Sequence, residues 1–319
     1  MGIRSLTSMM VLAVTMSATA VFSALPAASA WMPEKPIKIV IPFGAGGSTD
    51  TFGRVFANAM EAQTGWTIVV ENRPGAGGAV GQIECINANP DGYTVCLSST
   101  SLFAIQPFMP DTPEELTPDS VEYLGTLGAV PFAIVAKPDA PYNNLAELAE
   151  YTKANGPVRF AATNPQITLA MNQLSADLGF EFLPAQTSGS SESLQLVSGG
   201  HADITVSGGV HVAYVLDGRL KVLAHLTDER GAYASDKLTV EEQGGTLPHR
   251  NLWLFNVAKG VDPEVKDALA KAIDDTVNTQ AVKDHAAKIH VSLRNLGPDG
   301  STSVIMSEAE KWSKILSSN

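Results

Sequence analysis

Two short glycine-rich segments, residues 44–50 and 74–78, hold the residues best suited to bind a small anion. Glycine has no Cβ, so its backbone N–H can approach a ligand closely. Each segment precedes a predicted helix, whose start carries roughly half a positive charge. A single glycine loop could be an ordinary tight turn, but two in succession, at the carboxyl ends of adjacent strands, favour binding. We therefore expect the two loops to cradle an anionic group such as a carboxylate.

Each polar side chain of these loops can be interpreted in two ways. Ser48 and Thr49 carry hydroxyls that can cap the following helix or donate to a carboxylate. Asp50 fits a helix cap and an i,i+4 partner of Arg54 better than an acid catalyst. Arg73 could clamp a second carboxylate or lie in solvent. The loops thus predict binding without requiring any reaction.

The sequence holds none of the short motifs that indicate catalysis. It has no GxxxxGK(S/T) phosphate loop, no G-x-S-x-G elbow and no H-E-x-x-H metal motif. Thr49 stands where the third glycine of a nucleotide-binding GxGxxG belongs, and His201 and His211 have no companion Ser or Cys motif. We expect no catalytic residue, no metal and no cofactor. Two alternatives stay open: an exported α/β enzyme acting on a carboxylate, and a ligand sensor for a signalling partner.

The glycine loops belong to a repeating pattern of strands and helices. β-Branched residues at 37–43 predict a buried strand, and apolar residues at helical spacing predict a helix at 49–64. The pattern recurs as a strand at 66–71, a helix at 79–87 and a strand at 93–98. Such alternation predicts an α/β fold with parallel strands and helices on both sheet faces. Further strands are expected at 130–135, 158–162, 202–207, 220–225 and 251–258, and further helices at 169–178, 262–290 and 302–316.

The first thirty residues differ from the rest of the chain. Arg4 supplies a short positive start, residues 9–25 are mostly apolar or small, and Ala28-Ser29-Ala30 fits a cleavage site. We expect residues 1–30 to be a cleaved signal peptide and the mature protein to be periplasmic.

Length, charge and cysteine content narrow the class of protein. A chain of 319 residues suggests two lobes. The formal net charge is −12, and loss of Arg4 with the signal peptide makes it −13. This acidic balance argues against nucleic acid, which needs clustered Lys and Arg. Cys85 and Cys96 are the only cysteines. Export permits a disulfide between them, but two reduced, buried thiols fit the sequence equally well.

Residues 31–99 contain four motifs: Pro33-x-Lys35-Pro36-Ile37, Pro42-Phe43-x-Ala45-Gly46-Gly47-x-Thr49-Asp50, Val70-Glu71-Asn72-Arg73-Pro74-Gly75-Ala76-Gly77-Gly78 and Pro90-Asp91-Gly92-Tyr93-Thr94. With these motifs, the segment resembles the receptors of tripartite tricarboxylate transporters, also called the Bug family. Later features, Trp253 and a Glu308-x-x-Lys311-Trp312 helix, follow the family's layout more loosely.

The resemblance implies a two-lobed periplasmic-binding-protein fold of type II, the Venus flytrap, with the ligand cleft between the lobes. Lobe 1 would comprise residues 31–127 and 248–319, and lobe 2 residues 128–247, with crossings near Gly128 and Leu247. The protein would capture a small di- or tricarboxylate, or a related acid, by lobe closure and deliver it to the membrane permease of a tripartite tricarboxylate-type transporter. We expect a monomer.

The resemblance also implies that the loops at 43–50 and 74–79 grip one carboxylate. The second lobe departs from the family's usual pattern at residues 162–166 and 185–190, so its contacts are hypotheses drawn from uncharged donors and one Asp. The candidate ligand-binding residues are Phe43, Gly44, Ala45, Gly46, Gly47, Ser48, Thr49, Asp50, Gly75, Ala76, Gly77, Gly78, Ala79, Ser99, Thr163, Asn164, Gln166, Ser188, Gly189 and Asp203.

Overall fold

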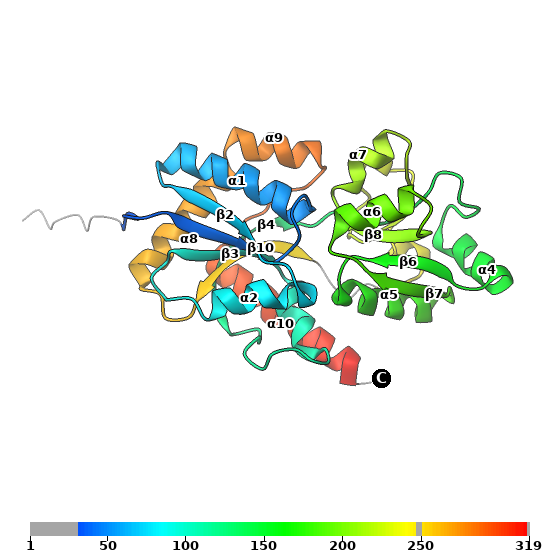
Figure 1. Ribbon diagram of the computed structural model, residues 1–319, viewed down its shortest axis with the longest axis horizontal. Helices are drawn as coiled ribbons and strands as arrows, with labels where there is room; N and C mark the ends of the chain where they lie inside the picture. The colour runs from blue at the N-terminus through cyan, green and yellow to red at the C-terminus, as the bar shows by residue number, and fades with distance from the viewer. Residues whose placement is uncertain (1–30, 247–250, 318–319) are drawn as a thin grey trace, which may run out of the picture. The chain divides into compact units, whose positions relative to one another are not determined.

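Two five-stranded sheets organise the part of the chain that the structure describes (Figure 1). The structure is a computed structural model, and it describes residues 31–246 and 251–317. The expected signal peptide at 1–30 and the expected crossing near Leu247 lie outside the described residues. Within the described ranges, no helix has both the length and the apolar character that a membrane span requires.

The first sheet has the strand order β2-β1-β3-β10-β4. β2 and β3 both pair with β1 in parallel, whereas β10 runs antiparallel to its neighbours β3 and β4. The strands are β1 (Ile37–Ile41), β2 (Ile68–Asn72), β3 (Thr94–Ser99), β4 (Val121–Ala129) and β10 (Leu252–Ala258).

Alternating residues of β1 divide the core of this sheet into two layers. Ile37, Ile39 and Ile41 face α1 (Ser48–Thr64), α8 (Pro263–Val277) and α9 (Gln280–Lys288). Val40 faces the opposite way, toward α2 (Ala79–Ile86). That second face is also covered by α3 (Ser101–Ala104) and α10 (Gly297–Ser317). In Figure 1, α1 and α9 accordingly lie on one side of the sheet and α2 and α10 on the other.

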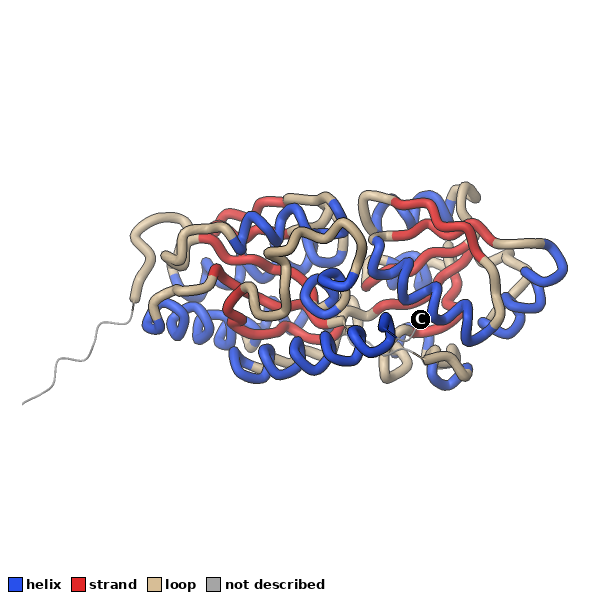
Figure 2. Tube along the Cα trace, turned by 90° about the horizontal axis from the view of Figure 1, so that it is seen from below, coloured by secondary structure: helices blue, strands red, loops and turns tan. Residues whose placement is uncertain are grey.

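The second sheet has the order β7-β6-β8-β5-β9, in which β5 is antiparallel to β8 and β9. α4 and α5 cover one face, and α6 and α7 cover the other (Figure 1). Figure 2 shows helices, in blue, next to the strands, in red, of both sheets. The elements are β5 (Phe132–Ala136), α4 (Leu145–Asn155), β6 (Val158–Ala162), α5 (Pro165–Leu178), β7 (Phe182–Gln186), α6 (Ser190–Ser198), β8 (Ile204–Gly208), α7 (His211–Leu216) and β9 (Lys221–His225).

The chain passes from one sheet to the other over a very short stretch. β4 ends at Ala129 in the first sheet, and β5 begins at Phe132 in the second. The returning strand β10 inserts between β3 and β4, so the first sheet is built from both ends of the chain. This is the two-lobed periplasmic-binding-protein fold that the family resemblance implies.

Some details of the predicted elements were wrong. β10 and β5 are antiparallel to their neighbours, against the expectation of parallel strands. The single helix expected at 262–290 is two helices, because the turn at Asn278 and Thr279 ends α8 before α9 begins. The sequence prediction also lacked β4, α3, α4, β7, α6 and α7.

Cys85 and Cys96 form a disulfide, which decides between the two alternatives that the sequence left open. Their Cα atoms lie 6.1 Å apart, within the ordinary range for a disulfide. Both side chains are fully buried beside Val40. The bond therefore joins α2 to β3 inside the first lobe.

Candidate functional site

The loop between β1 and α1 is shaped around the carboxylate of Asp50. Gly46, at φ +73°, donates its N–H to Asp50 over 2.8 Å. Asn72 Nδ2 donates to the same carboxylate over 3.0 Å, and Arg54 Nε lies 2.9 Å from it. Burial alone would raise the pKa of Asp50, but the bonds from Gly46, Arg54 and Asn72 lower it overall. Asp50 therefore stays ionised and holds the loop.

The start of α1 leaves hydrogen-bond donors free. Gly47 caps the helix without a side-chain bond, and the N–H groups of Ser48 and Thr49 have no hydrogen-bond partner in the described part of the chain. Trp253 Nε1 donates to Thr49 Oγ1 over 3.0 Å. Because an indole N–H can only donate, the Thr49 oxygen is the acceptor and its own hydrogen stays available. The α1 start thus presents N–H and O–H donors together.

A cavity beside the α1 start is lined by residues of both lobes. Its volume is about 60 Å³, which is several times the roughly 10–15 Å³ that one water molecule needs. It therefore suits a small molecule. Its lining consists of Phe43, Gly44, Gly47, Ser48, Thr49, Ser99, Val130, Phe132, Thr163, Asn164, Ser188, Gly189, Ser190, Asn251 and Trp253.

None of these lining residues carries a formal charge. Three helix starts meet at the cavity instead: Ser48 begins α1, Asn164 caps α5, and Gly189 caps α6. Helix starts attract anions through their partial positive charge and unpaired N–H groups. The cavity can therefore hold a small anion without a basic side chain.

Two polar side chains of the lining differ in their hydrogen bonding. Asn251 Oδ1 accepts from Thr100 Oγ1 over 3.2 Å. The buried Oγ1 of Thr163, by contrast, has no partner within residues 31–246 and 251–317. A buried polar atom without a partner costs free energy, of order 1–3 kcal/mol. A ligand or water at Thr163 would relieve that cost.

The glycine loops also form contacts between the two lobes. Ser191 Oγ, in the first turn of α6, donates to the Gly46 carbonyl over 2.7 Å. Gln166 Nε2, at the start of α5, donates to the Gly77 carbonyl over 3.1 Å. A Cβ on Gly44 would lie 2.8 Å from the Ser188 carbonyl oxygen. Because these glycines have no side chain, the two lobes can approach each other closely.

A model described as "Tripartite tricarboxylate transporter family receptor" matches residues 52–319 of the chain. The chain belongs to this family of receptors. Among curated proteins, BugT of Bordetella pertussis is 28% identical over 308 residues, which cover 92% of each chain. The periplasmic binding protein BugD is 26% identical with a TM-score of 0.83, over 90% of this chain and 98% of that one. MatC from Rhodopseudomonas palustris, solved with bound malate, is 20% identical with a TM-score of 0.82, over 89% and 100% of the chains, and shares the fold.

Membership of the family settles the class of the protein. Its members are periplasmic solute-binding receptors rather than enzymes, so the enzyme alternative is set aside. The prediction of the Bug family from residues 31–99 is confirmed by the matches to BugT and BugD.

The structure brings half of the sequence-predicted site residues of the receptor to the cavity. Those that line it are Phe43, Gly44, Gly47, Ser48, Thr49, Ser99, Thr163, Asn164, Ser188 and Gly189. Those that do not line it are Ala45, Gly46, Asp50, Gly75, Ala76, Gly77, Gly78, Ala79, Gln166 and Asp203. Most of the second group shape the loops or join the lobes. Sequence reasoning missed Val130, Phe132, Ser190, Asn251 and Trp253.

Asp203 is the one candidate that lies far from this arrangement. It precedes β8, whereas Thr163 follows β6, and the two strands run parallel, so the residues sit at opposite ends of the sheet. The Asp203 carboxylate pairs with Arg159 over 2.7 Å and accepts its backbone N–H. The Arg159 bond lowers the pKa of Asp203. Asp203 is therefore a structural ion-pair partner.

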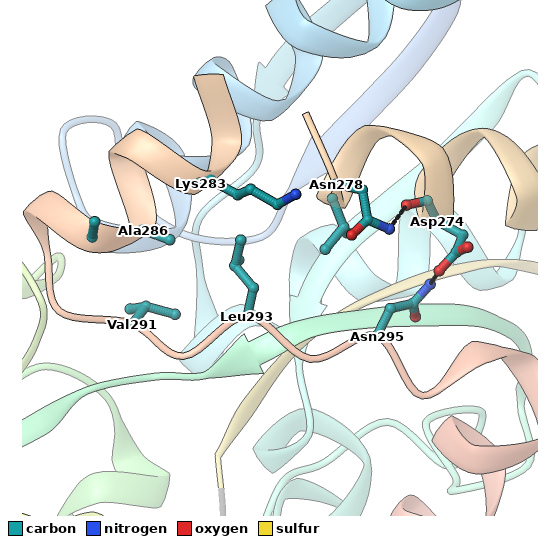
Figure 3. A pocket seen from close by; sticks show the side chains of 9 residues that line it. Asp274, Asn278, Lys283, Ala286, Val291, Leu293 and Asn295 are labelled. Atoms are coloured by element: carbon teal, nitrogen blue, oxygen red, sulfur yellow. Dashed lines mark hydrogen bonds between the residues drawn. The ribbon is translucent and has the colours of Figure 1, made fainter. Parts of the chain in front are cut away.

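A second, larger cavity of about 440 Å³ lies in the first lobe beside α8 and α9 (Figure 3). Asp274 accepts there from Asn295 over 2.9 Å, and Lys283 extends toward Asn278. All its lining residues belong to 274–295. Binding there would not require the second lobe, so the cavity shared by both lobes is the better candidate for a solute.

Proposed function

We propose that the receptor captures a small organic carboxylate in the shared cavity and delivers it to the permease of a tripartite tricarboxylate-type transporter. The family supports transport of such acids. The observation that carries the carboxylate assignment is the α1 start, where the Thr49 hydroxyl and two free N–H groups face one cavity. The ligand-binding residues we propose are the cavity-lining residues together with the N–H groups of this start.

Binding is coupled to closure in this proposal. We assign lobe 1 to residues 31–127 and 248–319, and lobe 2 to residues 128–247, so the first crossing falls at the last two residues of β4. A ligand in the cavity contacts both lobes only when they are shut, so binding shifts the population toward the closed form. The bonds from Ser191 to Gly46 and from Gln166 to Gly77 are available only in that form. They add to the ligand's own contacts and support closure.

Three further parts of the proposal concern the cell. Residues 1–30 are removed on export, the mature receptor is a monomer in the periplasm, and its closed form is the one the permease recognises. The mass of the exported protein would test the first part, and light scattering would test the second. Capture of the permease subunits by the ligand-loaded but not the empty receptor would support the third.

A thermal-shift screen against mono-, di- and tricarboxylates tests the central claim. At a ligand concentration of 100 Kd, binding to the folded state alone adds roughly 2.7 kcal/mol to stability. X-ray scattering should then show a smaller radius of gyration with the best acid. If no carboxylate raises the Tm, or if the best acid leaves scattering unchanged, the proposal of carboxylate capture by closure is wrong.

A further inference from the structure

Helix α5 carries buried apolar side chains on two of its sides. Ile167, Met171 and Leu174 recur at helical spacing and pack into the core of the second lobe. Leu169 and Ala170 belong to a different cluster, whose other members all lie in the first lobe. One side of α5 therefore packs on its own sheet, and the other packs on the opposite lobe.

Helix α10 reaches this contact from the first lobe. Ile305, Ala309 and Trp312 are buried at spacings of four and three residues, so they form one stripe along the helix. Ile305 belongs to the core of the first lobe, whereas Trp312 shares a cluster with Ala170 of the second lobe. We call this cluster the α5–α10 latch; it comprises Ala104, Ile105, Met109 and Trp312 of the first lobe and Leu169 and Ala170 of the second.

The centre of the α5–α10 latch is shielded from water. Ala104, Ile105 and Trp312 are at most 2% exposed, and Ala170 is 8% exposed. Separation of the lobes would return part of this apolar surface to water, which is unfavourable in proportion to the area exposed. The latch therefore favours the closed arrangement whether or not a ligand is bound.

The hydrogen bonds between the lobes favour closure less than the latch does. Gln166 Nε2 donates to Gln106 Oε1 over 2.5 Å, but Gln166 Oε1 is buried and has no partner in the described part of the chain. Water would hydrate both amides in an open form, so the unpaired oxygen offsets the gain from the bond. The bond from Ser191 to the Gly46 carbonyl is exposed, so water replaces it at little cost when the lobes part. Apolar burial between α5 and α10 is thus the main contribution to closure in the absence of a ligand.

We propose that the α5–α10 latch holds part of the receptor population closed before any ligand binds. None of its residues lines the shared cavity, so the latch acts on a ligand only through closure. The measured Kd equals the Kd of the closed form divided by the closed fraction, so a latch that raises this fraction also raises affinity. The latch thus sets ligand affinity from outside the cavity. The effect on affinity rests on the proposed function, whereas the closed fraction of the ligand-free protein depends on lobe movement alone.

Ala170→Glu tests the latch in the protein purified after export. The substitution places a carboxylate in the apolar contact of the closed form, which is costly, whereas an open form leaves it in water on a helix that tolerates Glu. X-ray scattering of the ligand-free variant should show a larger radius of gyration than that of the parent. Calorimetry with the carboxylate that gives the largest thermal shift should show a Kd about tenfold higher or more. Ala176→Glu makes the same change at an exposed position of α5 and should alter neither quantity.

The outcomes separate the latch from the proposed function. An unchanged ligand-free radius of gyration in a folded Ala170→Glu protein overturns the latch and leaves the proposed function standing. If no carboxylate binds the parent, the proposed function fails, and ligand-free scattering of the two Glu variants still decides the latch. If Ala170→Glu does not fold, Leu169→Ala shortens a latch side chain without adding charge and should also enlarge the ligand-free protein. An unchanged radius of gyration in that variant would likewise refute the proposal.

Discussion

Gly44→Ala should weaken ligand binding without weakening the fold. Gly44 has no positive φ, so its backbone conformation accepts alanine. The added Cβ would lie 2.8 Å from the carbonyl oxygen of Ser188, a backbone atom in the other lobe. Because that neighbour belongs to the second lobe, the overlap exists only when the lobes are closed. The substitution therefore acts on closure.

The size of the effect follows from the overlap. Accommodating one extra methyl group in a packed contact costs about 1–3 kcal/mol. If this cost falls on the closed form, the Kd of the ligand rises roughly 5- to 150-fold. Titration calorimetry with the best carboxylate measures this change, and thermal unfolding of the ligand-free protein should stay near that of the parent.

Gly260→Ala is the matched control for Gly44→Ala. Gly260 has φ +86° and nothing within 4 Å of an added Cβ, so alanine there strains the backbone by about 1–2 kcal/mol without blocking closure. It should lower the Tm and leave the Kd unchanged. A normal Kd for a folded Gly44→Ala protein would show that the ligand-bound state lacks this contact, and our account of closure would fail.

Three further perturbations test separate parts of the structure. Thr49→Val removes the hydroxyl that accepts from Trp253 and donates to the ligand, so calorimetry should show a Kd about 10- to 100-fold higher. Thr49→Ser keeps a hydroxyl and should bind nearly as tightly as the parent protein. Equal affinities of Thr49→Val and the parent protein would show that Thr49 does not contact the ligand. Burial lowers the pKa of His211 to about 3. Below pH 6.5 the unfolded chain therefore binds more protons at His211 than the folded protein does. Denaturant titrations should show a free energy of unfolding that is constant above about pH 7 and falls toward pH 4. His211→Phe should reduce this decline. Reduction of the Cys85–Cys96 disulfide should cost about 3 kcal/mol; an unchanged Tm after confirmed reduction would contradict that value.

The sequence predicts the first half of the first lobe well and fails at strands that carry unusual residues. β1, α1, β2 and α2 are recovered because each has a clear apolar pattern and is bounded by glycine, proline or asparagine. β4 contains Gly125 and Gly128, which in isolation indicate turns. In the structure a Cβ on Gly125 would lie 2.5 Å from Asn295 Oδ1, so the glycine is needed for a close approach by a distant segment. β7 contains Pro184 and is an exposed edge strand, where proline is tolerated.

The site shows the same limit at the level of side chains. Thr49 and Ser188 could be found because they lie in loops next to helix starts, where local sequence indicates binding. Phe132 and Trp253 lie on strands and carry no local signal, since their place at the cavity depends on how two sheets meet. Gly77 illustrates the converse: its loop has the composition of an anion cradle, but its carbonyl contacts Gln166 of the other lobe. Composition alone does not distinguish close approach to a ligand from close approach to a neighbouring lobe.

The position of β10 sets an order in which the lobes can form. β4 pairs with no strand of its sheet other than β10 among the described residues, and β10 lies more than a hundred residues later in the chain. All strands of the second sheet, by contrast, fall within residues 132–225. When the chain is synthesised from its N-terminus, the second lobe can complete its sheet before β10, the strand that pairs with β4, has been made. The half of the receptor that begins the sequence is therefore the half that finishes folding last.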